Sequence, residues 1–168
     1  TNQSLYCWGY DSHPYNNPAS GHSSTPVWVD NNWEGTNNVS FIEISMGYHH
    51  TTLLVENEDG SVAVQGIGYG HPNGELGQWT ISSLGTDPVD LPGVPVAVDS
   101  GQKHSCAVLT NGSVYCWGGN WHGELGVGYR CVSGLEGECD GEYLMAEHHE
   151  PMLLPTGRTA VAIDAYGY

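Results

Sequence analysis

Short apolar runs alternate with polar turn sequences along the whole chain. Residues 106–109 and 113–116 are typical: each run is rich in β-branched and aromatic side chains and has the length of a β-strand. Glycine, asparagine and proline bound the runs, and no segment shows the 3.6-residue periodicity of an amphipathic helix. The pattern predicts an all-β protein.

The turn sequence Thr110-Asn111-Gly112 separates these two runs and predicts a β-hairpin. A two-residue loop would place Cys106 opposite Trp117. A three-residue loop with its glycine in the left-handed conformation places Cys106 opposite Cys116 instead. Directly opposed residues have the short Cβ separation that a disulfide needs, so this register predicts a cross-strand bridge.

The same strand recurs as SLYCWG, SVAVQG and SVYCWG, at residues 4–9, 61–66 and 113–118. GELG follows twice, then Pro26, Pro88 and Pro151 open related runs, and FIEISMGYHH, VAVDSGQKH and VAIDAYGY end the copies. A period of about 50 to 60 residues indicates a repeat architecture. In the second copy Thr52 and Val64 replace the two cysteines of the predicted bridge, so both are missing together. We expect a longer loop there, at residues 56–60, that keeps Thr52 opposite Val64.

Each copy has about four short strands, which favours β-propeller blades of antiparallel strands. We expect one repeat region, residues 1–168, with repeats at about 1–60, 61–112 and 113–168 and a loop insertion at 129–150. Three repeats lacking roughly one strand cannot easily close a ring. We therefore expect them to form part of a larger or oligomeric propeller.

The order of these motifs resembles the repeat of the regulator-of-chromosome-condensation family. It is more similar still to a cysteine-containing "CWG" branch found in extracellular and cell-surface proteins. The resemblance covers the whole chain and is strongest in residues 96–126. It implies a β-propeller, usually of seven blades, that serves as a binding platform through its loops and faces.

Composition changes what the resemblance implies about partners. The chain has 19 acidic and 3 basic residues and a formal net charge of −16. Clustered basic residues are absent, so we expect no nucleic-acid partner, and no apolar run is long enough to predict a membrane span. Paired cysteines favour an oxidising, extracellular or cell-surface location. Candidate glycosylation acceptors in Asn-x-Ser triplets are Asn38, Asn2 and Asn111.

The other cysteines raise the question of their partners. Cys131 and Cys139 lie in one insertion and can close their own loop. Cys7 is left over, because the repeat places its partner on a strand that would precede Thr1. We expect Cys7 to be unpaired or to form an intermolecular bridge.

The insertion also carries clustered acidic residues and histidines. Glu138, Asp140, His148 and His149 could converge on Ca²⁺ or Zn²⁺, although their spacing matches no recognised metal loop. A solvated acidic loop is the favoured interpretation, with no metal and no cofactor.

Catalytic chemistry is poorly supported. His50 and His104 occupy the same repeat position, which favours a shared structural role, and no nucleophile elbow or phosphate-binding glycine loop is present. Trp8 and Trp117 also share a repeat position and are expected to pack the blades. We expect a protein that is not an enzyme.

Other aromatic residues fall in or near loops, where aromatic side chains often anchor partners. The candidates for contact are Trp33, Trp79, Trp121, Tyr15 and Tyr129. The sequence thus favours an extracellular or cell-surface platform that binds proteins or glycans. The alternative is a structural subunit that self-assembles into a filament or sheath through its open blade edges.

Overall fold

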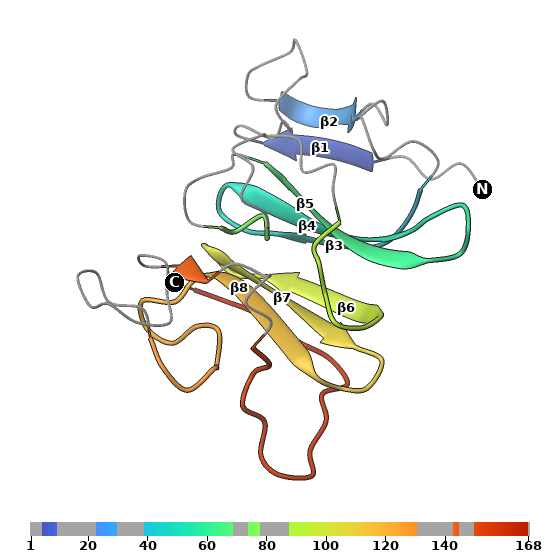
Figure 1. Cartoon of the computed structure of the whole chain (residues 1–168). Helices are drawn as coiled ribbons and strands as arrows, with labels where there is room; N and C mark the ends of the chain where they lie inside the picture. The colour runs from blue at the N-terminus through green and yellow to red at the C-terminus, as the bar shows by residue number, and fades with distance from the viewer. Residues whose placement is uncertain are drawn as a thin grey trace.

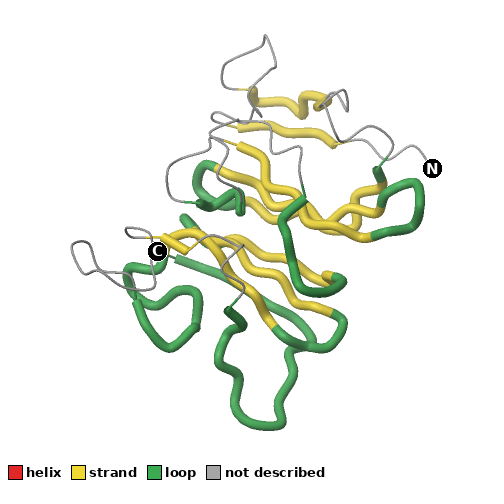
Figure 2. Tube along the Cα trace, in the orientation of Figure 1, coloured by secondary structure: helices red, strands yellow, loops and turns green. Residues whose placement is uncertain are grey.

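The computed structural model describes residues 5–9, 23–29, 39–68, 74–77, 88–130, 143–144 and 150–167. The regular secondary structure in these ranges is entirely β-strand (Figures 1 and 2). The strands are β1 (Leu5–Gly9), β2 (Ser23–Val29), β3 (Ser40–Met46), β4 (His50–Glu56), β5 (Val62–Gly68), β6 (Pro95–Ser100), β7 (His104–Leu109), β8 (Val114–Gly119) and β9 (Tyr143–Leu144).

The strands form three antiparallel sheets in the orders β1-β2, β3-β4-β5 and β6-β7-β8-β9. Figure 1 shows the sheets one above another, and in each sheet strands that follow one another along the chain are neighbours. This up-and-down order is that of propeller blades, so the predicted fold class is confirmed. The last sheet combines two sequence repeats: β6 and β7 come from the second repeat, and β8 and β9 come from the third.

The β7–β8 hairpin has the predicted register. Cys106 lies opposite Cys116, and Val108 lies opposite Val114. Gly112 has a φ of 77°, the left-handed conformation that the three-residue loop requires. The Oδ1 atom of Asn111 accepts hydrogen bonds from the backbone N–H of Ser113, at 2.9 Å, and from its hydroxyl, at 2.6 Å. This side-chain turn fixes where the hairpin reverses.

The β4–β5 hairpin corrects the predicted pairing of Thr52 with Val64. Thr52 lies opposite Gly66, and Val64 lies opposite Leu54. The turn is built as in β7–β8, since Asp59 Oδ1 accepts from the N–H and hydroxyl of Ser61 at 2.9 and 2.6 Å. The β4–β5 pairing extends two residues further from the turn than the β7–β8 pairing, so His50 lies opposite Gly68, whereas His104 lies opposite Gly118.

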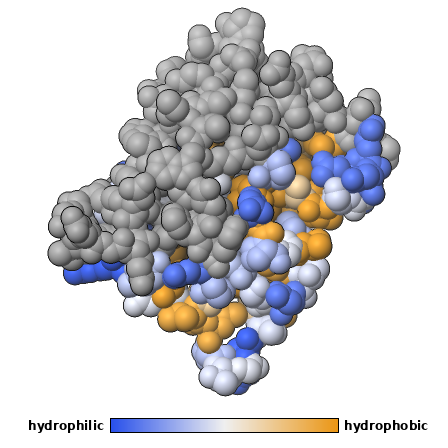
Figure 3. Space-filling model, in the orientation of Figure 1, coloured by the Kyte–Doolittle hydropathy of each residue, from blue (hydrophilic) through white to orange (hydrophobic). Residues whose placement is uncertain are grey.

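The core lies between sheets and behind the last one. Leu54 and Val64 of the middle sheet pack with Val98, Ala107 and Trp117 of the next. A second cluster surrounds the paired cysteines on the opposite face of β7 and β8. On the face drawn in Figure 3, apolar surface also reaches solvent between polar loops. Within the described ranges, no helix has the length and apolar character needed to cross a membrane.

Candidate functional site

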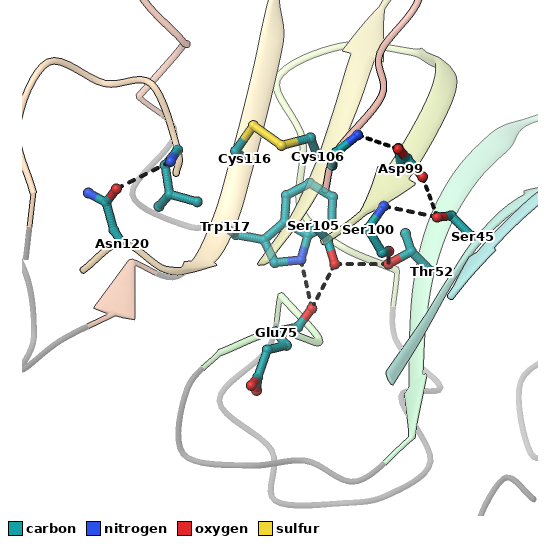
Figure 4. Close-up of a disulfide and its surroundings, with 12 residues drawn as sticks. Ser45, Thr52, Glu75, Asp99, Ser100, Ser105, Cys106, Cys116, Trp117 and Asn120 are labelled. Atoms are coloured by element: carbon teal, nitrogen blue, oxygen red, sulfur yellow. Dashed lines mark hydrogen bonds between the residues drawn. A yellow bond between two sulfur atoms is a disulfide. The ribbon is translucent and has the colours of Figure 1, made fainter. Parts of the chain in front are cut away.

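Side-chain oxygens of β3 bind the backbone of β6 in the next blade (Figure 4). The hydroxyl of Ser45 donates to Asp99 Oδ1 at 2.5 Å and accepts from the N–H of Ser100 at 2.9 Å. Nearby, Glu43 Oε2 accepts from the N–H of Val98 at 2.9 Å. These bonds satisfy backbone N–H groups of β6 and fix the offset between the two blades.

A buried chain of hydrogen bonds continues from this contact. Ser100 Oγ donates to Thr52 Oγ1 at 2.8 Å, and Thr52 donates to Ser105 Oγ at 2.9 Å. Ser105 donates its single hydroxyl proton to the backbone carbonyl of Glu75 at 3.2 Å. Because His50 Nε2 lies 2.9 Å from that same hydroxyl oxygen, the neutral ring of His50 carries its proton on Nε2 and donates it there.

The two repeat-related histidines are buried, and the side chain of His50 belongs to this network. Burial, with a smaller contribution from the neighbouring His104, lowers the pKa of His50 to about 4. Burial also lowers the pKa of His104, against the opposing effect of the Glu124 and Asp99 carboxylates. Ser105 has no exposed surface, and its hydrogen bonds with His50 and Thr52 join β7 to the preceding blade.

The turns between the first two strands of successive blades lie side by side. The N–H of Tyr48 donates to the carbonyl of Gln102 at 3.1 Å, and the N–H of Gln102 donates to the carbonyl of Gly167 at 2.9 Å. We call residues 47–49, 101–103 and 166–167 the inner-turn row. Glycine is required at 47 and 101, since a Cβ would lie 2.0 Å from His50 Cε1 and 2.1 Å from His104 Cε1, respectively.

The inner-turn row presents aromatic surface. Tyr48 is 66% exposed and Tyr166 is 96% exposed. The ring of Tyr48 packs edge-on against His49, with centroids 4.2 Å apart. The Lys103 ammonium lies 4.7 Å from the centre of the Trp121 ring, which joins the half-buried Trp121 to the same row. Sequence reasoning did not find this grouping, although the alignment of VAVDSGQ with VAIDAYG carried the signal.

The predicted contact aromatics have different outcomes. Trp121 lies beside the inner-turn row, whereas Tyr129 donates its hydroxyl to Glu150 Oε2 at 3.0 Å and packs against the cluster around the cysteines. Tyr129 therefore contributes to packing, and its role as a contact aromatic stays a prediction. The predictions for Trp33, Trp79 and Tyr15 lie outside the described residues.

The remaining predicted sites fall into two groups. Asn111 is exposed and its side chain holds the hairpin turn, and Cys7 lies on β1 opposite Val27. The other predicted residues lie outside the described ranges: Asn2, Asn38, Cys131, Cys139, Glu138, Asp140, His148 and His149. In the part of the chain that the structure describes, no three His, Cys, Asp or Glu residues lie close enough to hold a metal ion.

A disulfide joins Cys106 to Cys116, with their Cα atoms 4.0 Å apart. We expect Cys106→Ser to lower the free energy of unfolding by about 2–3 kcal/mol, because a cross-link that closes so short a loop removes modest chain entropy from the unfolded state. Urea unfolding of oxidised and reduced protein measures the loss. Reduction should cost the Cys106→Ser, Cys116→Ser double variant less than it costs the wild type, because only a bridge between Cys131 and Cys139 remains to be reduced, and an equal loss there would assign the effect to that bridge.

The fold and these contacts define blades of a β-propeller. Residues 96–124 match the regulator of chromosome condensation (RCC1) repeat. The chain is 34% identical over 87 residues to the zebrafish (Danio rerio) E3 ubiquitin-protein ligase MYCBP2, covering 51% of this chain and 2% of that protein. It is 31% identical over 91 residues to the Drosophila melanogaster regulator of chromosome condensation, covering 51% of this chain and 16% of that protein.

Solved structures show the same architecture. The yeast RCC1 protein Prp20 in its complex with Kap60 matches with a TM-score of 0.63 and 20% identity, over 95% of this chain and 34% of that one. A second structure, of Prp20p from Saccharomyces cerevisiae, gives a TM-score of 0.60, 20% identity and coverage of 95% and 35%. Human WBSCR16 matches with a TM-score of 0.51, 20% identity and coverage of 89% and 33%. The chain therefore consists of RCC1-like β-propeller repeats and spans about a third of these solved chains.

Proposed function

We propose that the chain is a non-enzymatic protein-binding module whose contact surface is the inner-turn row. The observation that carries this is the backbone pairing of Tyr48 with Gln102 and of Gln102 with Gly167, which places the turns of two successive blades and the segment around Gly167 on one continuous surface. Exposed tyrosines on a rigid backbone provide contact area at low entropic cost. Protein binding also fits the RCC1 neighbours, of which one is bound to Kap60 and another is described with its binding to Gsp1p and histones.

The negative charge of the chain narrows the class of protein partner that we propose. A formal net charge of −16 favours proteins with basic surfaces and speeds their association. Glycans are the second ligand class that we propose for this surface, because exposed aromatic rings present apolar faces for contact with a ligand. An extracellular or cell-surface location is proposed on the disulfide and on the resemblance to the CWG branch.

The test is binding of the chain to panels of basic secreted proteins and of neutral oligosaccharides. We expect the Tyr48→Ala, Tyr166→Ala double variant to lose about tenfold or more in affinity for its ligand, since aromatic anchors dominate interface energies. Tyr6, 50% exposed on β1, provides the matched control, and Tyr6→Ala should bind normally. Full binding by the double variant would show that the contact surface lies elsewhere.

A second function is favoured by a different observation. Apolar side chains of β3, among them Ile44 and Met46, are exposed on the side of the strand that faces away from the next blade. A structural subunit that self-assembles into a filament or sheath through such open blade faces would cover this surface.

A further inference from the structure

The open face of β3 has a covered counterpart inside the molecule. The backbone N–H groups of Gly47 and Gly101 each donate to the carbonyl of the histidine three residues further on, at 2.8 and 3.0 Å, so the two glycines occupy equivalent positions. The residues just before them, Met46 of β3 and Ser100 of β6, are therefore equivalent as well. The N–H of Ser100 is held by the preceding blade through Ser45 Oγ, at 2.9 Å. Met46 is 67% exposed, and its strand presents the same edge with no such blade against it in the described ranges.

One rule describes both inter-blade contacts. We call β3, β6 and the segment 161–167 the inner strands. A side-chain oxygen on one inner strand accepts a hydrogen bond from a backbone N–H of the next inner strand, and the donor lies one residue beyond the position equivalent to the acceptor. Ser45 does so to Ser100, and Asp99 Oδ2 does so to Ala165. Ser45 and Asp99 occupy equivalent positions, so the rule depends on the position and not on one side chain.

The last described segment supplies the next member of the series. Since Tyr48 pairs with Gln102, and Gln102 with Gly167, Gly167 occupies the Gln102 position. Counting back three residues makes Asp164 the equivalent of Asp99. Ile163 packs into the cluster around the cysteines, whereas Asp164 is exposed and alternation turns it to the opposite side. Within the described ranges, no neighbouring blade lies against the acceptor Asp164 or against the donor N–H of Met46.

We propose that the segment 161–167 of one copy docks on the open face of β3 in a second copy, head to tail. In this joint Asp164 accepts from the N–H of Met46, as Asp99 accepts from Ala165, and the N–H of Gly167 donates to the carbonyl of Tyr48, as that of Gln102 donates to Gly167. Tyr166, 96% exposed, and Ile44, 40% exposed, become buried along the same strand pair.

The heterologous contact continues the stacking of the blades from one molecule to the next. Such a contact gives a ring when its rotation closes and an open filament when it does not. The inference rests on the second proposed function, self-assembly, and names the joint that it would use.

The experiment is sedimentation velocity of the 168-residue chain over a range of about 1 to 100 µM. We expect the average mass to rise with concentration. Met46→Glu places a like charge against Asp164, and Asp164→Ala removes the acceptor, so each should raise the dissociation constant about tenfold or more. Val94, 51% exposed and apolar, provides the matched control, and Val94→Glu should associate like the wild type.

A charge pair tests the contact itself. Met46→Lys should strengthen association, because a lysine at that position faces Asp164 of the neighbouring copy. Asp164→Lys combined with Met46→Glu should restore association that each substitution alone removes. Rescue of this kind requires that the two side chains meet, and a merely misfolded variant would not show it.

Four results would overturn the joint. A chain that stays monomeric at every concentration removes both the joint and self-assembly as a function. Association that survives Met46→Glu and Asp164→Ala leaves self-assembly standing but places it on another surface. Native material in which a further blade of the same polypeptide covers Met46 assigns the face to that blade. Loss of association in Val94→Glu as well would show a general charge effect.

Discussion

Replacing Trp117 by alanine should lower the free energy of unfolding by about 4 kcal/mol, within the range found for removing a large buried aromatic side chain. Trp117 is 1% exposed and packs between two sheets with Leu54, Val64 and Val98. Its Nε1 also donates to the carbonyl of Glu75 at 3.1 Å. The substitution therefore opens a cavity between blades and removes one of two donors from that carbonyl.

Chemical unfolding followed by far-ultraviolet circular dichroism measures this loss. Trp8 provides a matched control, because it occupies the same repeat position on β1 but is 63% exposed. Trp8→Ala should change stability by less than about 0.5 kcal/mol, as surface substitutions usually do. Trp117→Phe keeps most of the volume and should cost less than alanine. Equal losses at Trp8 and Trp117 would contradict the packing role assigned to Trp117.

The contrast between these tryptophans shows what repeat position can predict. Their shared repeat position predicted that both belong to blades. The backbone conformation is the same in the two copies, since Gly9 and Gly118, which follow the tryptophans, have φ values of 109° and 100°. Burial depends on the strands and blades that surround each copy, which the local sequence does not contain. The same motif therefore produced a buried side chain in one blade and an exposed one in another.

The hairpins show a second limit. In β7–β8 the asparagine turn and its glycine determined the register, because local turn chemistry sets where the chain reverses. In β4–β5 the same chemistry, at Asp59, predicted the turn but not how far the strands continue beyond it. The β4–β5 pairing is longer because two more residues separate His50 from Ser61 than separate His104 from Ser113.

The inner-turn row was beyond sequence reasoning for a related reason. Tyr48, Gln102 and Gly167 meet through backbone atoms, and no side-chain motif marks that contact. The weak similarity of the three turns indicated equivalent positions. It could not indicate that equivalent positions of successive blades lie next to one another, which follows only from the stacking of the sheets.

Acidification should destabilise the fold by about 3 kcal/mol between pH 6.5 and pH 4. The pKa of His50 falls from 6.5 to about 4 in the folded protein because of its burial and of His104 nearby. The unfolded chain therefore binds more protons than the folded one in this window, and stability falls as the pH falls. The contribution is fully present above pH 6.5 and is lost by about pH 4. The lowered pKa of His104 acts in the same direction.

The carboxylate beside this network titrates in a separate window. Burial raises the pKa of Asp99, but hydrogen bonds from Ser45, Ala165 and Ser100 outweigh it and hold that pKa below the ordinary 3.8. A lowered carboxylate pKa gives stability that is lost only as the pH falls through the folded value. The slope of stability between pH 6.5 and 4 therefore reports the histidines.

Unfolding curves measured at several pH values, in the wild type and two variants, assign the effect. His50→Phe removes the titrating ring together with its bond to Ser105, so it should lower stability at pH 7 but flatten the slope below pH 6.5. His122→Gln, at an exposed loop histidine, should keep the wild-type slope. A slope that survives in His50→Phe at full size would contradict the assignment. Since His50 and Ser105 belong to different blades, a flattened slope would locate the acid-sensitive contact at the interface between blades.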